Sequence, residues 1–243
     1  MKEKKNQWDK KARNYNRYSP DNSRFEAKVI HKIEELGIDF SQKNIIDVGA
    51  GTGAYTIRLA KKAHFVVAMD FSSQMLEVLK EDAIKEKVSN LKTQVSSWSD
   101  YKLEQTFDIA FTTMSPALSD AKDFLKFHEC AQTKIYLGWA GQRDSDILQK
   151  LFEVHDTFYT PPNGSQELKN WLNSQKIPFT CKEFDELKIS TCKDEEGLEK
   201  YKWHLEIRDV IPQEKLILNV LKDFSKDGII TETTKNKMNL IIW

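Results

Sequence analysis

The sequence predicts an α/β fold whose mostly parallel sheet is covered by helices on both faces. Two observations carry this prediction. Short strand patterns alternate with amphipathic helix patterns from residue 44 onward, and the strands are apolar throughout rather than at every second residue. At 243 residues, of which 40% are hydrophobic, the chain can bury such a core, and we expect a single domain over 1–243.

The alternation is clearest in the first 140 residues. We expect strands, with helices between them, at 44–48, 64–69, 91–95, 107–113 and 134–139. Before them, two helix patterns predict an N-terminal helical cap over 1–37, with Ser23 and Glu26 as a capping box for the second helix.

The last third of the chain is less regular. A helix at 165–175 and a strand near 179–190 precede two helix patterns, and the chain ends in a strand pattern at 238–243. We expect the helices of 193–226 to be a helical addition between the last two strands of the sheet.

Charge and cysteine content narrow the function classes. Lysine plus arginine and aspartate plus glutamate both total 37, so the net charge is +0, and a basic nucleic-acid binder is disfavoured. Cys130, Cys181 and Cys192 are scattered without a C-x-x-C pair, which argues against a metal site or disulfides and favours the cytoplasm. No apolar run approaches the roughly 20 residues of a membrane span.

A glycine-rich turn is the sharpest functional signal. Asp47-Val-Gly-Ala-Gly-Thr-Gly53 follows the first strand pattern and opens a helix. Glycines at such a junction allow a tight turn and let a ligand approach the backbone. The next strand ends in Asp70, 21 residues after Gly49 (70 minus 49), where a carboxylate can accept hydrogen bonds from both hydroxyls of an adenosine ribose.

The same turn fits two classes of cofactor. Gly49-x-Gly51-x-x-Ala54 matches the dinucleotide fingerprint, which holds a pyrophosphate at a helix N-terminus. Asp47, two residues earlier, would repel a pyrophosphate but suits the ammonium group of a methionine. S-adenosylmethionine is therefore favoured over NAD.

Residues 44–81, NIIDVGAGTGAYTIRLAKKAHFVVAMDFSSQMLEVLKE, resemble the first two motifs of class I S-adenosylmethionine-dependent methyltransferases. Both D-x-G-x-G-T-G and D-x-S-x-x-M-L are present. The resemblance covers 40–140 and implies a cofactor-binding core there. It also implies a Rossmann-like, seven-stranded sheet of order 3-2-1-4-5-7-6 whose seventh strand is antiparallel and is supplied by the final strand pattern.

The resemblance assigns roles within these motifs. Asp47 and the backbone of Gly49, Ala50 and Gly51 would hold the methionine part of the cofactor, with Gly53 in the same turn. Asp70 would hold the ribose. The residues implied beside the adenine are Phe71, Met75, Ser97 and Trp98. The family often has an aspartate at the position of Ser97, so the sequence departs from the pattern there.

Further residues are implied around the sulfonium and the acceptor. The loop after the fourth strand places Thr113 and Met114 near the sulfonium and Ser115 near the substrate. Tyr15 and Tyr18 lie where relatives close an N-terminal helix over the cofactor. We expect the substrate pocket to include Trp139, Arg143 and Tyr159, with Arg143 a candidate partner for an anionic group.

The sequence thus predicts methyl transfer from S-adenosylmethionine to a small-molecule acceptor by in-line displacement. The cofactor supplies most of the reactivity, so no catalytic dyad is needed, and we identify no catalytic residue. Three alternatives remain: a methyltransferase acting on RNA or protein, an NAD-dependent oxidoreductase, and a non-catalytic module that binds S-adenosylmethionine. The sequence does not indicate an oligomeric state.

Overall fold

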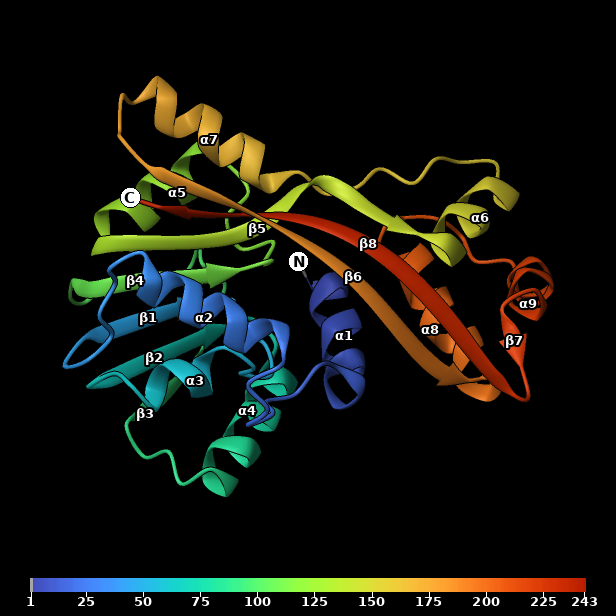
Figure 1. Ribbon diagram of the computed structural model, residues 1–243, viewed down its shortest axis with the longest axis horizontal. Coiled ribbons are helices and arrows are strands. Elements are labelled where there is room, and N and C mark those ends of the chain that lie inside the picture. Colours follow the sequence, from blue (N-terminus) through green and yellow to red (C-terminus); the bar gives the residue numbers. More distant parts are fainter. Residues whose placement is uncertain (1) are drawn as a thin grey trace. The chain divides into compact units, whose positions relative to one another are not determined.

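The computed structural model describes residues 2–243, with side chains described from residue 5 (Figure 1). Its strands are β1 Asn44–Val48, β2 Phe65–Asp70, β3 Leu91–Val95, β4 Phe107–Thr113, β5 Ala131–Ser145, β6 Thr180–Lys193, β7 Ser225–Lys226 and β8 Ile229–Ile242. Its helices are α1 Lys2–Lys11, the 3₁₀-helix Ala12–Asn14, α2 Phe25–Glu35, α3 Thr56–Ala60, α4 Ser73–Lys85, α5 Ala121–Glu129, α6 Asp146–Val154, α7 Gly164–Ser174, α8 Asp194–Glu206 and α9 Glu214–Lys222.

The strand order confirms the predicted fold class. The sheet runs β3-β2-β1-β4-β5-β8-β6, and the two-residue β7 pairs with β8 alone. If the two-residue β7 is left out and β8 is counted as the seventh strand, this order is 3-2-1-4-5-7-6, as predicted. β1 pairs in parallel with β2 and β4, and β4 pairs in parallel with β5. Lys134 on β5 and Trp243, which follows β8, exchange both backbone hydrogen bonds, at 2.9 and 3.1 Å, which is the antiparallel pattern.

The chain divides into two compact units where the sequence predicts one domain. The first unit comprises the described residues through Leu137, together with Leu168–Thr180 and Ile241–Trp243. The second comprises Gly138–Glu167 and Cys181–Leu240. The long strands β5 and β8 contribute residues to both.

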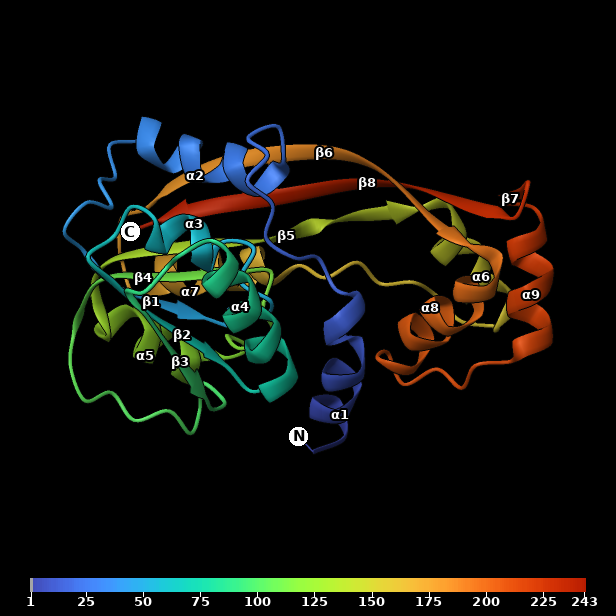
Figure 2. The same ribbon diagram turned by 90° about the horizontal axis from the view of Figure 1, so that it is seen from below.

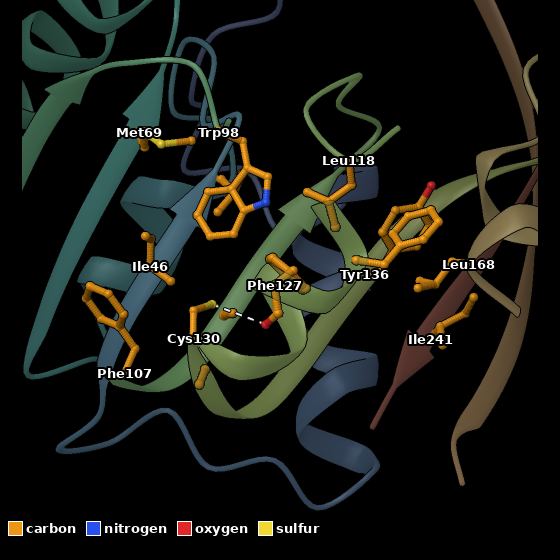
Figure 3. Packing of buried hydrophobic residues seen from close by; sticks show 14 of the residues in the cluster. Ile46, Met69, Trp98, Phe107, Leu118, Phe127, Cys130, Tyr136, Leu168 and Ile241 are labelled. Carbon is orange, nitrogen blue, oxygen red and sulfur yellow. Dashed lines mark hydrogen bonds between the residues drawn. The ribbon is translucent and has the colours of Figure 1, made fainter. Parts of the chain in front are cut away.

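One large hydrophobic cluster of the first unit lies on the face of the sheet that α5 and α7 cover. Residues from alternate strand positions, such as Ile46 and Met69, belong to one buried cluster with Phe127 from α5 and Leu168 from α7 (Figure 3). Helices α2 and α3 lie on the other side of β1 and β4 (Figure 2). Helices on both faces explain why these strands are apolar throughout.

The second unit has its own core between α6, α8 and α9. These helices present buried aliphatic residues to one another, among them Leu151, Leu205 and Leu221. Helices α8 and α9 follow β6 and precede β8, as the predicted helical addition requires.

Two details of the prediction are wrong. Helix α2 begins after Arg24 without a side-chain cap, because the Ser23 backbone N–H and Oγ both donate to Asp21, each at 2.8 Å. Ser23 therefore closes its own turn instead of forming a capping box with Glu26. In addition, β8 begins at Ile229, well before residue 238. Among the described residues, no helix combines the length and apolar character that crossing a bilayer requires.

Candidate functional site

The glycine turn follows β1 and is fixed to the end of β2. The backbone N–H groups of Gly49 and Ala50 both donate to the carbonyl oxygen of Met69, at 2.8 and 2.9 Å. Gly49, Gly51 and Gly53 have φ values of 77°, 55° and 84°, which side chains other than hydrogen rarely tolerate. The sequence forms this turn because glycine occupies each left-handed position.

The three glycines have different surroundings. A Cβ on Gly49 would lie 2.0 Å from Ser115 Oγ, and one on Gly53 would lie 2.6 Å from Cγ of Leu79. A Cβ on Gly51 would meet no atom within 4 Å. Gly53 therefore permits close packing of the turn on α4, and Gly51 is the point at which the backbone faces open space.

Asp47 is a buried carboxyl at the end of β1, with 2% of its surface exposed. It accepts one side-chain hydrogen bond, from Thr56 Oγ1 at 2.6 Å. Burial, with a smaller contribution from the charge of Asp70, raises the pKa of Asp47 to about 7 despite that hydrogen bond. A cationic group beside Asp47 would favour its charged form.

Asp70 ends β2 on the opposite side of the turn. Its carboxylate accepts hydrogen bonds from the backbone N–H groups of Gly51, at 2.9 Å, and Ser72, at 2.8 Å. Burial is the main cause that raises the pKa of Asp70, and the charge of Asp9 adds to it. Asp70 thus ties the turn to the start of α4 and keeps further acceptor positions.

Asp9 on α1 is a residue that the sequence analysis missed. Its carboxylate accepts from Ser72 Oγ at 2.6 Å and from Lys5 Nζ at 2.5 Å. Ser72 is also the N-cap of α4, where its hydroxyl accepts from the Met75 N–H. An acidic residue in a lysine-rich helix was the available signal, and it fastens α1 to Ser72, close to Asp70.

The segment between the 3₁₀-helix and α2 is anchored next to the turn. Thr52 Oγ1 donates to the carbonyl of Asn16, and Arg58 Nη2 donates to the carbonyl of Ser19 at 2.5 Å. Tyr18 lies against the guanidinium of Arg58, at 5.3 Å from its ring centroid. Tyr15 is 40% exposed and contacts Trp8 edge-on. The structure therefore brings this segment to the turn, with Tyr18 directed at α3.

The loop after β4 completes this edge of the sheet. Thr112 Oγ1 donates to the carbonyl of Val48 at 2.8 Å, and the N–H of Met114 donates to the carbonyl of Leu137 at 2.7 Å. Met114 has a φ of 47°, which turns the chain and directs Ser115 against Gly49. Ser115 thus adjoins the glycine turn, whereas Thr113 and Met114 lie beside Leu137 of β5.

Comparisons with known proteins agree with this geometry. Residues 45–133 match the family model described as a methyltransferase domain. These residues form a methyltransferase domain. They include the glycine turn, Asp70 and the loop after β4.

Other similarities are limited in extent or show the fold alone. A probable ribosomal RNA small subunit methyltransferase A from Methanosphaera stadtmanae is 38% identical over 50 residues, which are 21% of this chain and 18% of that protein. The YcgJ protein from Bacillus subtilis has a TM-score of 0.56 at 14% identity, over 88% of this chain and 97% of that one. A putative methyltransferase from Bacillus halodurans has a TM-score of 0.53 at 13% identity, with the same two coverages.

The residues implied for the adenine end of the methyltransferase domain are placed unevenly. Phe71 is half-buried directly after β2, whereas Met75 is 2% exposed and packs with Ala12 in a small cluster. The hydroxyl of Ser97 donates to Asp100 at 2.6 Å. The family often has an aspartate at the position of Ser97. In this chain the carboxylate of Asp100, three residues later in the sequence, lies against the Ser97 side chain.

Trp98 does not offer a face for stacking. Its side chain is 2% exposed, its Nε1 donates to the carbonyl of Asp123 at 3.2 Å, and it packs against Phe127 and Tyr101 (Figure 3). The prediction that Trp98 lies beside the adenine is therefore wrong, because the indole is part of the core of the first unit.

The residues predicted for the substrate pocket belong to the second unit. Arg143 lies over the ring of Trp139, at 5.2 Å from its centroid. Tyr159 follows α6 and contacts the ring of Phe152. Arg208, which the sequence analysis did not single out, lies 4.9 Å from the ring centroid of Tyr159.

Proposed function

We propose that the methyltransferase domain binds S-adenosylmethionine at the glycine turn and transfers its methyl group to a small-molecule acceptor. Asp47 carries the proposal: it is a buried carboxyl with one side-chain partner, two residues before a turn whose backbone is open at Gly51. Such a group is costly to ionise unless a cation accompanies it.

The residues of the turn fit this cofactor. The ammonium group of its methionine part provides the cation for Asp47, and its ribose hydroxyls provide donors for Asp70. Gly51 leaves space for close approach because a Cβ there would meet nothing within 4 Å. A dinucleotide fits less well, since its pyrophosphate would add negative charge near two buried carboxylates.

When bound, the cofactor supplies an electrophilic methyl group on a cationic sulfur. The chain's own part is to bind and orient the reactants and to exclude water. Asp47 and Asp70 fix the cofactor from two sides, and the Thr113–Ser115 loop adjoins the turn, where the acceptor would enter. The segment fastened by Thr52 and Arg58 covers the same edge.

A small-molecule acceptor is favoured by the charge of the chain. Lysine plus arginine equals aspartate plus glutamate, at 37 each, so the chain has no net positive charge with which to attract RNA. The partial similarity to a probable ribosomal RNA methyltransferase makes RNA the second candidate.

Transfer of a labelled methyl group tests this proposal. The full chain is incubated with labelled S-adenosylmethionine and either a metabolite extract or total RNA. We expect label in the metabolite fraction with the wild type, a loss of at least about tenfold with Asp70→Ala, and no change with the exposed control Asp223→Ala. Label in RNA alone would refute the acceptor, and cofactor binding without transfer to either fraction would indicate a non-catalytic module.

A further inference from the structure

Strand β6 forms an open edge of the sheet in the second unit. It has 14 residues, and within the described part of the chain it pairs with β8 alone (Figure 1). Ser190 Oγ donates to Glu232 at 3.3 Å, and Glu186 accepts from Asn236 Nδ2 at 2.8 Å, so β8 runs along one side of β6. The backbone N–H and C=O groups on the other side of β6 point away from the sheet and can pair with a further strand.

The two faces of β6 differ in what covers them. Cys192 packs against the same hydrophobic cluster as Ile230 of β8 and the buried residues of α6, α8 and α9. Because side chains alternate along a strand, the even-numbered residues of β6 face these helices and the odd-numbered residues face the opposite side. Leu187 and Ile189 lie on that opposite face, where they are 64% and 66% exposed. The odd face of β6 is therefore an exposed apolar strip along an open edge.

A second copy of β6 can pair with this edge in few registers. Two antiparallel copies related by a two-fold axis perpendicular to the sheet keep the same face on the same side, so one residue lies opposite itself. Centring the pairing on Asp185, Glu186 or Lys188 places a charge opposite the identical charge, which is destabilising. Centring it on Phe184 places Glu183 opposite Asp185, again two like charges.

The register centred on Leu187 has complementary charges. Glu186 of each copy lies opposite Lys188 of the other, so two pairs of opposite charge flank the axis. This register pairs the whole of 181–193. Centring on Ile189 instead shortens the paired segment and loses both pairs of opposite charge. The charges that oppose the other registers therefore favour this one.

The same register covers the exposed apolar side chains. On the odd face, Leu187 meets Leu187 of the second copy, and Ile189 lies diagonally from it, within reach of a branched side chain. On the even face, Lys188 forms no ion pair with another described residue, and Glu186 Oε2 accepts one hydrogen bond, from Asn236. Both charged groups thus remain able to pair between copies.

We propose that β6 is the interface of a homodimer, in which two copies of β6 pair antiparallel with Leu187 at the two-fold axis. The partner is a second copy of this chain, and the two sheets continue through the interface. The interface lies within residues 181–193 and does not depend on the methyl transfer proposed above.

Exchange of the two charges tests the interface and its register. Sedimentation equilibrium of the full chain over a concentration series measures the dissociation constant of the dimer. Glu186→Lys or Lys188→Glu alone places like charges opposite each other twice, and each should weaken dimerisation by at least about tenfold. A mixture of these two variants restores opposite charges at both positions and should form heterodimers with nearly wild-type affinity.

An exposed apolar residue in each unit supplies a matched pair of variants. Leu187→Lys places two lysines at the axis and should weaken dimerisation by at least about tenfold. Ile84→Lys makes the same kind of change on α4, where Ile84 is 78% exposed, and should change the dissociation constant by less than about twofold. If Glu186→Lys does not fold, Lys188→Glu and Leu187→Lys, which alter exposed side chains, carry the test.

Three results would overturn the proposal. The first is a wild type that is monomeric at every concentration up to about 1 mM. The second is a dimer that Leu187→Lys leaves unchanged, since it would be formed by another surface. The third is a mixture of Glu186→Lys and Lys188→Glu that forms no heterodimer, because the predicted register requires these charges to face each other.

Discussion

Asp47 is buried at a cost in free energy, and it is the residue that we propose binds the ammonium group of the cofactor. The folded chain raises its pKa from 3.8 to about 7, so between those pH values the folded state binds more protons than the unfolded state. The free energy of unfolding therefore falls as pH rises through this window. In the absence of ligand, the ionised carboxylate is destabilising at neutral pH and above.

Asp47→Asn should remove this penalty. A shift of about three pKa units corresponds to about 4 kcal/mol, so the ligand-free variant should gain up to that much at pH 8 and little at pH 4. Urea unfolding at pH 5 and pH 8 measures the change, with Asp223→Asn as an exposed control. An unchanged pH dependence in Asp47→Asn would show that the buried carboxyl is not its source.

The glycines of the turn allow a second test at single residues. Gly49→Ala forces a Cβ to within 2.0 Å of Ser115 Oγ at a φ of 77°, whereas Gly51→Ala, at a φ of 55°, meets open space. We expect Gly51→Ala to cost about 1 kcal/mol of stability from backbone strain alone, and Gly49→Ala to cost more. Chemical denaturation of both variants measures the difference. Ser115→Gly should partly restore Gly49→Ala, and lack of any rescue would refute the proposed clash.

Helix α1 depends on Asp9 for its attachment. Besides Ser72 and Lys5, the carboxylate accepts from the backbone N–H of Gln74 at 3.3 Å. Asp9→Ala should therefore free α1 from the start of α4 and speed amide hydrogen exchange in α1 by about tenfold, while the rest of the first unit stays protected. Lys10→Ala, which lies on the same helix, should leave the exchange rates of α1 unchanged. Equal exchange in Asp9→Ala and the wild type would mean that other contacts hold the helix.

The elements differ in how well the sequence predicts them. The bounds of β1, β3 and β4 agree with the prediction, and β1 and β4 are short, largely apolar runs followed by glycine or polar residues. The first part of β8 was missed because its buried positions include Glu232, Thr234 and Asn236. Their burial depends on partners distant in sequence, such as Lys200, and a local pattern cannot show them.

The same distinction applies to the candidate site. Asp47, Asp70 and the glycine turn could be predicted because strand ends and glycine spacing are local properties of the sequence. Asp9 and Arg208 could not, because their contacts depend on how helices pack. Trp98 was assigned to the wrong environment for the same reason: an aromatic residue after a strand is equally compatible with a ligand and with a core.

At the scale of the whole molecule, the two units contain buried carboxyls with opposite pH responses. Burial opposes ionisation of Glu232, but the charge and hydrogen bond of Lys200, together with Ser145, lower its pKa from 4.5 to about 2. Its contribution to stability is therefore present above pH 4.5 and is lost as pH falls toward 2. Asp47 in the first unit has the reverse dependence.

Glu232→Gln should destabilise the chain by about 3 kcal/mol at pH 7, because it leaves Lys200 without its buried partner. The loss should shrink as pH falls below 4. Thermal unfolding at pH 3 and pH 7 measures it, and Glu195→Gln, which removes an exposed carboxylate, should have little effect at either pH. A loss of equal size at both pH values would argue against an ionised Glu232.

Cofactor binding is measured most directly by calorimetric titration of the full chain with S-adenosylmethionine, S-adenosylhomocysteine and NAD. We expect both methionine-derived cofactors to bind and NAD not to bind. Asp70→Ala should weaken the binding of S-adenosylmethionine by at least about tenfold. Because Asp47 becomes protonated below pH 7, the affinity of the wild type should fall there, and Asp47→Asn should abolish this pH dependence. Tight binding of NAD with no response to either methionine-derived cofactor would contradict the proposed role of Asp47 and Asp70.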